Sequence, residues 1–152
     1  MWQPGTIAGF DLPHAPGTPS WFECRSTGFD AAAKFYCDVF DWALVDRTGA
    51  VHDGTRYVTN GSPTGTLDDG TPCPVVCGLA DAATLPGPEQ SSRWLIYFHT
   101  PEVAAGCEAA ERLGAAIGAT GSTPFGATGS TPFGAFAHVT DPCGAEFVLN
   151  GQ

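Results

Sequence analysis

The sequence predicts an α+β fold in which two βαβββ modules pack into one domain, with a curved mixed sheet around a cleft. The first observation is a repeated order of elements (strand, helix and three short strands) in the two halves of the 152-residue chain. The second is that the halves match after a shift of 73 residues, which aligns Trp21 with Trp94 and Thr27 with Thr100. Neither half is large enough to bury its helix and sheet face alone, so we expect a shared core.

The first module is predicted over residues 19–79. It opens with the alternating segment 19–25, PSWFECR, which is typical of a strand. Residues 27–42 carry apolar side chains at helical spacing, and Thr27 or Asp30 can cap that helix. We expect three short strands to follow, near 43–46, 56–59 and 72–79.

The second module is predicted over residues 92–151, after a connector at 80–91. The apolar segment 92–99, SRWLIYFH, predicts its first strand. Thr100 is then the expected N-cap of a helix that ends at Gly114. Further strands are expected near 115–119, 135–140 and 146–150.

Composition and charge limit the partners of this protein. The net charge of −10 repels phosphate backbones, so we expect no nucleic-acid partner, whereas cationic small molecules would be attracted. No apolar stretch reaches the roughly 20 residues that cross a bilayer, and we expect no membrane partner. We expect residues 1–18 to form an irregular, linker-like arm; they lack the features of a signal peptide, so a cytoplasmic location is expected.

The six cysteines are expected to be reduced thiols, because the chain can build a core without disulfides. Cys73 and Cys77 are the only closely spaced pair. They lack a second pair or a nearby histidine, so they are a weak zinc signal.

Three segments carry a family resemblance: DAAAKFYCDVFDW at 30–42, the strand and helix at 92–114, and FAHVTDPCGAEFVL at 136–149. Together they resemble the vicinal oxygen chelate superfamily, which includes glyoxalases, extradiol dioxygenases and fosfomycin- and bleomycin-resistance proteins. The resemblance implies one glyoxalase/bleomycin-resistance-type domain over 19–151. It is closest to a subgroup in which such domains occur in tandem, joined by a segment similar to the first ten residues here, MWQPGTIAGF.

The resemblance also bears on metal binding. Metal-dependent members carry ligands at four places, two in each half, on the strands that line the cleft. The corresponding places here are Trp21, Trp94, Val148 and one within 72–79, where only cysteines could act as ligands. Tryptophan and valine cannot coordinate a metal, so we expect a glyoxalase-like protein without a metal or other cofactor. A slip of the alignment by one or two residues would instead bring Glu23 or Glu146 into play.

Strand periodicity gives the candidate site residues. We expect Trp21 and Trp94 to face each other across the cleft. Arg25 stands four residues beyond Trp21, where glutathione-dependent glyoxalases bind a substrate carboxylate, but an ion pair with Glu23 or a surface acid is an alternative. The acid–base candidates are Glu23, His138 and Glu146, and His138 can equally be a packed strand residue. The ligand-binding candidates are Trp21, Arg25, Trp94, Ile96, Phe98, Phe136, Val148 and Asn150.

An octapeptide, GATGSTPF, occurs twice in succession at 118–125 and 126–133. Removal of one copy restores the loop length typical of the resembling family, so this is a tandem duplication in a loop. It either lengthens a lid tipped by Phe125 and Phe133 or is a neutral insertion, which a loop tolerates at little entropic cost.

These features favour a metal-independent protein that binds a small aromatic or cationic compound in an aromatic cleft, and that could serve drug sequestration and antibiotic resistance. The alternative is a metal-independent isomerase, lyase or cyclase of small-molecule metabolism. A metal-dependent lactoylglutathione lyase or dioxygenase is a third hypothesis. We expect a homodimer, or a chain that has lost a tandem-domain partner.

Overall fold

A computed structural model describes residues 15–48, 54–61, 75, 77–85, 91–118, 128–131 and 134–151. The first module comprises β1 (Pro19–Ser26), α1 (Phe29–Phe40), β2 (Leu44–Asp46), β3 (Tyr57–Asn60), β4 (Cys77–Asp81) and a short 3-10 helix (Ala82–Thr84). The second comprises β5 (Arg93–His99), α2 (Val103–Arg112), β6 (Ala116–Ile117), β7 (Thr128–Thr131), β8 (Gly134–Thr140) and β9 (Glu146–Gly151). The predicted α+β fold is confirmed, and β7 is an additional strand.

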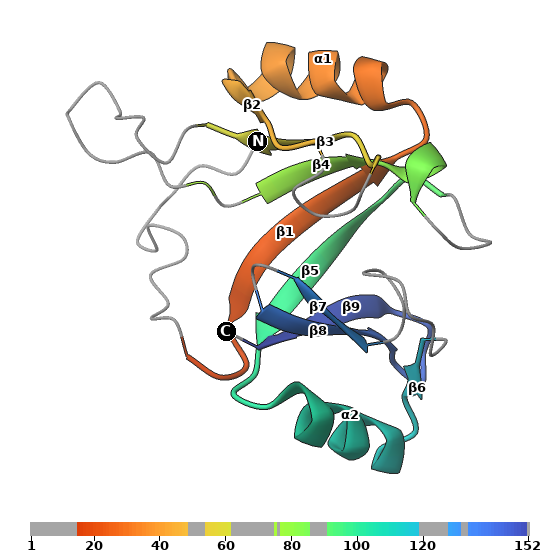
Figure 1. The fold of residues 1–152 in the computed structure, drawn as a ribbon. Coiled ribbons are helices and arrows are strands. Elements are labelled where there is room, and N and C mark those ends of the chain that lie inside the picture. The colour runs from red at the N-terminus through yellow and green to blue at the C-terminus, as the bar shows by residue number, and fades with distance from the viewer. Residues whose placement is uncertain are drawn as a thin grey trace, which may run out of the picture.

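All the strands belong to one mixed sheet, in the order β2-β3-β4-β1-β5-β9-β8-β6, and β7 pairs with β8 outside this path. The two first strands, β1 and β5, pair in antiparallel orientation and join the modules. Each also pairs in parallel with the last strand of its own module, β1 with β4 and β5 with β9. The modules therefore meet at the middle of a continuous curved sheet (Figure 1).

The helices start later than the sequence predicted. Helix α1 begins at Phe29, and its N-cap Gly28 has no side chain to offer. Helix α2 begins at Val103, and its N-cap is Glu102 rather than Thr100. The Glu102 carboxylate accepts a hydrogen bond from the helix backbone, as N-cap oxygens do. The two helix starts are thus one residue further apart than the shift of 73 residues indicated, which matters for the site below.

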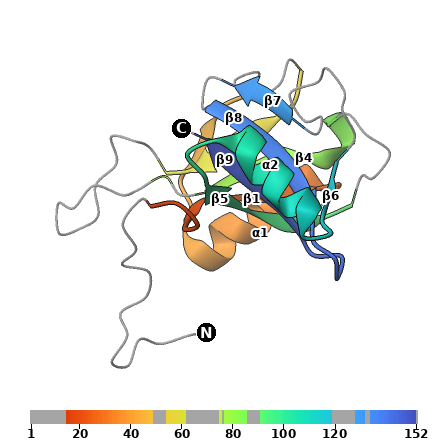
Figure 2. The same cartoon turned by 90° about the horizontal axis from the view of Figure 1, so that it is seen from below.

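Both helices cover the same face of the sheet, one at each end, and we call this the outer face (Figure 1). Under α1, the side chains of Cys24, Phe29 and Leu79 form a buried cluster. Under α2, Val103, Cys107 and Ala137 form another, and Figure 2 shows α2 lying across β8 and β9. Because side chains alternate along a strand, the other residues of these strands lie on the opposite, inner face.

Two further findings concern the described residues. Five cysteines, Cys24, Cys37, Cys77, Cys107 and Cys143, are free thiols, whereas Cys73 lies outside the described residues. No helix in the described part of the chain is long and apolar enough to cross a membrane.

Candidate functional site

The inner face gathers polar side chains from both modules into one row across the middle of the sheet. Strand register places Trp21 of β1 beside Tyr97 of β5, Tyr97 beside Val148 of β9, and Val148 beside His138 of β8. Residues two positions along each strand lie on the same face. The inner face therefore also carries Glu23, Arg25, Arg93, Leu95, Phe136, Glu146 and Asn150.

Arg25 is the centre of this face. Its Nε lies 2.9 Å from Oε1 of Glu23, and both side chains are buried, with relative exposures of 9% and 3%. Its Nη2 lies 3.2 Å from Nε2 of His138, in the other module. The ion pair with Glu23, one of the two roles expected for Arg25, is therefore present. The guanidinium also joins the two modules through His138.

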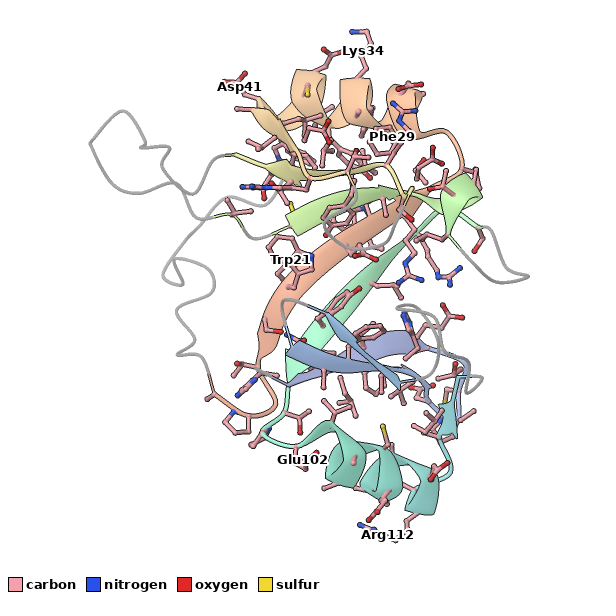
Figure 3. All side chains as sticks on the ribbon, in the orientation of Figure 1. Trp21, Phe29, Lys34, Asp41, Glu102 and Arg112 are labelled. Atoms are coloured by element: carbon pink, nitrogen blue, oxygen red, sulfur yellow. The ribbon has the colours of Figure 1, made fainter. Side chains whose placement is uncertain are left out.

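Three aromatic side chains extend this network. The side chain of Tyr97 lies close enough to Glu23 and Arg25 for both to affect its pKa. The hydroxyl of Tyr57, from β3, accepts a hydrogen bond from Nε1 of Trp21 at 3.1 Å and lies near Glu23. Trp21, labelled in Figure 3, projects from β1 and is half-buried.

Tyr57 can lie beside Glu23 because β4 has a glycine at the crossing point. A Cβ atom at Gly78 would collide with the hydroxyl and ring of Tyr57. Gly78 is the register partner of both Glu23 on β1 and Thr59 on β3. The absence of a side chain on β4 thus lets the Tyr57 ring lie across that strand.

Burial and neighbouring charges fix the ionisation of the network. Burial is the main cause that lowers the pKa of His138 to about 3, and the charges of Arg25 and Arg93 lower it further. His138 is therefore neutral at physiological pH. Burial alone would lower the pKa of Arg25, but Glu23 and Tyr97 outweigh it, so the pKa lies above its ordinary value. Burial, followed by the charge of Glu23, raises the pKa of Tyr57 well above its usual range.

A second ion pair lies beside the first. Nε of Arg93 lies 2.8 Å from Oε2 of Glu146, and these side chains are partly exposed, at 25% and 36%. Arg93 is also the register partner of Arg25. Like charges directly opposite each other on paired strands are unfavourable. Here each arginine has its own carboxylate, so the four charges balance.

The inner face does not fit a metal ion. The described residues contain no group of three or more His, Cys, Asp or Glu side chains that could hold one. Glu23 and His138 are suitable donor types, but the Arg25 guanidinium contacts both of them. A divalent cation placed between them would meet that positive charge directly.

Three of the expected ligand-binding residues lie elsewhere. We expected Trp94, Ile96 and Phe98 to share the cleft face with Trp21, and this is wrong. The register pairs Cys24, on the outer face, with Trp94, so all three side chains lie on the outer face. The cause is the one-residue difference in spacing noted above, since such a shift moves every side chain of a strand to the other face.

Trp94 is instead part of an aromatic cluster with α1. Its Nε1 donates to the hydroxyl of Tyr36 at 3.0 Å, and it makes edge contacts with Tyr36 and Trp42. Trp94 and Ile96 are 44% and 38% exposed on this outer surface. Phe98 packs edge-on against Phe147 of β9.

The other expected residues lie on the inner face but differ in accessibility. Val148 is fully buried in a cluster with Leu95 and Phe136. Asn150 is also buried, at 8% exposure, while Glu146 is exposed. The groups that a ligand could reach are the exposed Glu146 and four half-buried residues, namely Trp21, Arg93, Tyr97 and His138.

Sequence reasoning missed Tyr57, Tyr97 and Arg93. Alignment of the two helix starts, Phe29 with Val103, would have placed Tyr97 and Arg93 on the inner face. No comparable signal points to Tyr57, which reaches the site only because β3 pairs with β4.

With this geometry in place, comparison with known proteins gives the family. The family model "Glyoxalase/Bleomycin resistance protein/Dioxygenase superfamily" matches residues 19–149. The chain belongs to this superfamily. No curated protein matches its sequence. The expected membership of the vicinal oxygen chelate superfamily is thereby confirmed.

Solved structures of other superfamily members share the fold. One is a variant of Streptomyces coelicolor methylmalonyl-CoA epimerase in complex with 2-nitronate-propionyl-CoA, with a TM-score of 0.54 and 14% identity. The match covers 91% of this chain and 99% of that one. Another is a methylmalonyl-CoA epimerase in complex with methylmalonyl-CoA and NH4+, with the same TM-score and identity and coverages of 91% and 96%. At this identity the likeness shows the fold alone.

Proposed function

We propose that this superfamily member binds a small aromatic compound, neutral or cationic, on the inner face of its sheet without a metal ion. The observation that carries the proposal is the bridging position of Arg25. It holds the Glu23 carboxylate and the His138 imidazole together, while Trp21 and Tyr97 remain half-buried beside them. Aromatic walls with a few fixed polar groups are typical of sites for planar organic ligands.

The charge distribution supports this class of ligand. On the inner face Arg25 is balanced by Glu23, and Arg93 by Glu146. A ligand therefore meets little net local charge there, while the overall charge of −10 favours approach by cations. An indole face also attracts a cationic ring by cation–π interaction.

The same contacts disfavour acid–base catalysis by His138 and Glu23, two of the three residues we considered for it. An efficient general base has a pKa near the working pH, whereas the pKa of His138 is lowered to about 3. Glu23 is 2% exposed, and its Oε1 already accepts a hydrogen bond from Nε of Arg25. We therefore propose sequestration in preference to an isomerase, lyase or cyclase activity.

Tryptophan fluorescence tests this proposal. A variant with Trp2, Trp42 and Trp94 each replaced by Phe leaves Trp21 as the sole tryptophan. We expect aromatic cations and neutral polycyclic compounds to change its emission saturably, with no product detectable by mass spectrometry. Turnover that is lost in Glu23→Gln would favour the enzyme instead. If no compound in a broad panel changed Trp21 emission, the binding proposal would be wrong.

A further inference from the structure

The contacts of Arg25 have a common chemical feature. A guanidinium group has five N–H donors and no acceptor, so both atoms that it touches must act through lone pairs. These atoms are Oε1 of Glu23, on β1, and Nε2 of His138, on β8. Because Nε2 accepts, the ring proton of the neutral imidazole is on Nδ1. A carboxylate oxygen and a neutral imidazole nitrogen are also the donor atoms that divalent metals use in proteins.

We infer that the Arg25 guanidinium is a built-in cation, which fills a latent cation-binding site formed by Glu23 of the first module and His138 of the second. Its side chain reaches this position from β1, two residues beyond Glu23. The site is therefore permanently filled in the native protein. Removal of the side chain should open it to a cation from solution.

The burial of Glu23 explains why a cation is needed there. Glu23 is 2% exposed, and its neighbours Tyr57 and Tyr97 carry no positive charge that could balance the carboxylate. A buried carboxylate without a counter-charge is strongly unfavourable. Truncation at Arg25 thus leaves both a space and an uncompensated negative charge, and these two features together select a cation.

The test uses Arg25→Ala with two probes. Ethylguanidinium replaces the atoms that the truncation removes, and Co²⁺ tests the donor pair as a metal site. Binding is measured by isothermal titration calorimetry at neutral pH, and the thermal unfolding midpoint is recorded with each probe. Arg56→Ala is the matched control, because its ion pair with Asp30 lies on the surface, with side-chain exposures of 47% and 81%.

We expect Arg25→Ala to bind both probes at least about tenfold more tightly than the wild type or Arg56→Ala does, a readily measured difference. The unfolding midpoint of Arg25→Ala should rise with each probe, since a ligand that binds only the folded state stabilises it. Adding His138→Ala to Arg25→Ala should abolish Co²⁺ binding but leave ethylguanidinium bound at Glu23.

Two results would overturn the inference. One is a folded Arg25→Ala protein that binds neither probe better than the controls do. The other concerns an Arg25→Ala protein that is unfolded without a probe. In that case we expect refolding with ethylguanidinium or with Co²⁺ to restore the near-ultraviolet circular dichroism of the wild type. Failure of both probes to restore it contradicts a latent cation site.

Discussion

Arg25 and His138 belong to different modules, yet Nη2 of Arg25 lies 3.2 Å from Nε2 of His138. This contact connects the buried Glu23–Arg25 pair of β1 to β8 across the inner face of the sheet. The network therefore depends on both modules together, and its members should not behave as independent residues.

Replacement of Arg25 alone should lower the free energy of unfolding more than replacement of both Arg25 and Glu23. Arg25→Met leaves Glu23 as a buried charge without a partner, which should lower the free energy of unfolding by about 3–5 kcal/mol. In the double variant Glu23→Gln/Arg25→Met no charge is left behind, so the loss should be smaller than in Arg25→Met. Urea unfolding of the wild type and the variants measures the loss of free energy of unfolding in the single and in the double variant. A double variant at least as unstable as Arg25→Met would contradict the buried pair.

Stability should depend on pH through His138. The pKa of His138 is about 3 in the folded protein and near 6.5 in the unfolded chain, so only the unfolded chain takes up this proton in between. The contribution of His138 to stability is fully present above pH 6.5 and falls as the pH drops toward 3, by at most about 1.4 kcal/mol per pH unit. His138→Gln, which keeps an acceptor for Arg25, should lose less stability than the wild type between pH 7 and 4. If the two proteins lost stability equally as the pH fell, His138 would not be held neutral in the folded protein.

Neighbouring positions on β5 should respond differently because their side chains lie on opposite faces. Tyr97→Phe removes an inner-face hydroxyl that lies close to Glu23 and Arg25, and should lower the free energy of unfolding by about 1–3 kcal/mol. Ile96→Thr changes a side chain that is 38% exposed on the outer face, and should alter it by at most about 0.5 kcal/mol. Chemical denaturation of both variants tests the register of β5. If Ile96→Thr lowered the free energy of unfolding more than Tyr97→Phe did, Ile96 rather than Tyr97 would lie on the inner face.

Gly78→Ala should disturb the site through Tyr57. The added Cβ collides with the Tyr57 ring, so the free energy of unfolding should fall by about 1–3 kcal/mol, as for other overpacked sites. Gly28→Ala is the matched control, because nothing lies within 4 Å of a Cβ at that glycine. Trp21 emission should also shift in Gly78→Ala, since Trp21 donates to Tyr57. Equal effects of the two glycine substitutions would rule out close packing of Tyr57 on β4.

Deletion of one octapeptide should preserve β7. This strand is Thr128–Thr131 of the second copy, TGST, and the first copy contains the same four residues at 120–123. Deletion of either copy gives the same chain, which still supplies TGST to pair with β8. We expect an unfolding midpoint and ligand affinity equal to those of the full chain. Weaker binding in the shorter chain would instead support the lid hypothesis, whose Phe125 and Phe133 lie outside the described residues.

The sequence was sufficient to predict the two-module fold and the inner faces of β1, β8 and β9. On β1, Glu23 and Arg25 alternate with Phe22 and Cys24, so polar and apolar positions define the faces. On β5, the run from Trp94 to Phe98 is apolar or aromatic throughout. Such a strand does not show which side chains face inward, because apolar or aromatic residues occupy both of its faces.

The network itself could not be predicted from the sequence. Arg25 and His138 are 113 positions apart, and their contact depends on the order β1-β5-β9-β8 in the sheet. The position of Tyr57 depends on a glycine of the neighbouring strand. These are relations between strands, and a pattern along one strand does not contain them.

The measurement that tests the central claim most directly is a titration of the variant in which Trp21 is the sole tryptophan, after dialysis against EDTA. The proposal predicts saturable quenching of Trp21 by an aromatic compound, an affinity unchanged when Zn²⁺, Ni²⁺ or Mn²⁺ is added back, and recovery of the compound unaltered. Quenching that appears only after a metal is added, or recovery of a chemically changed compound, would contradict metal-independent sequestration on the inner face.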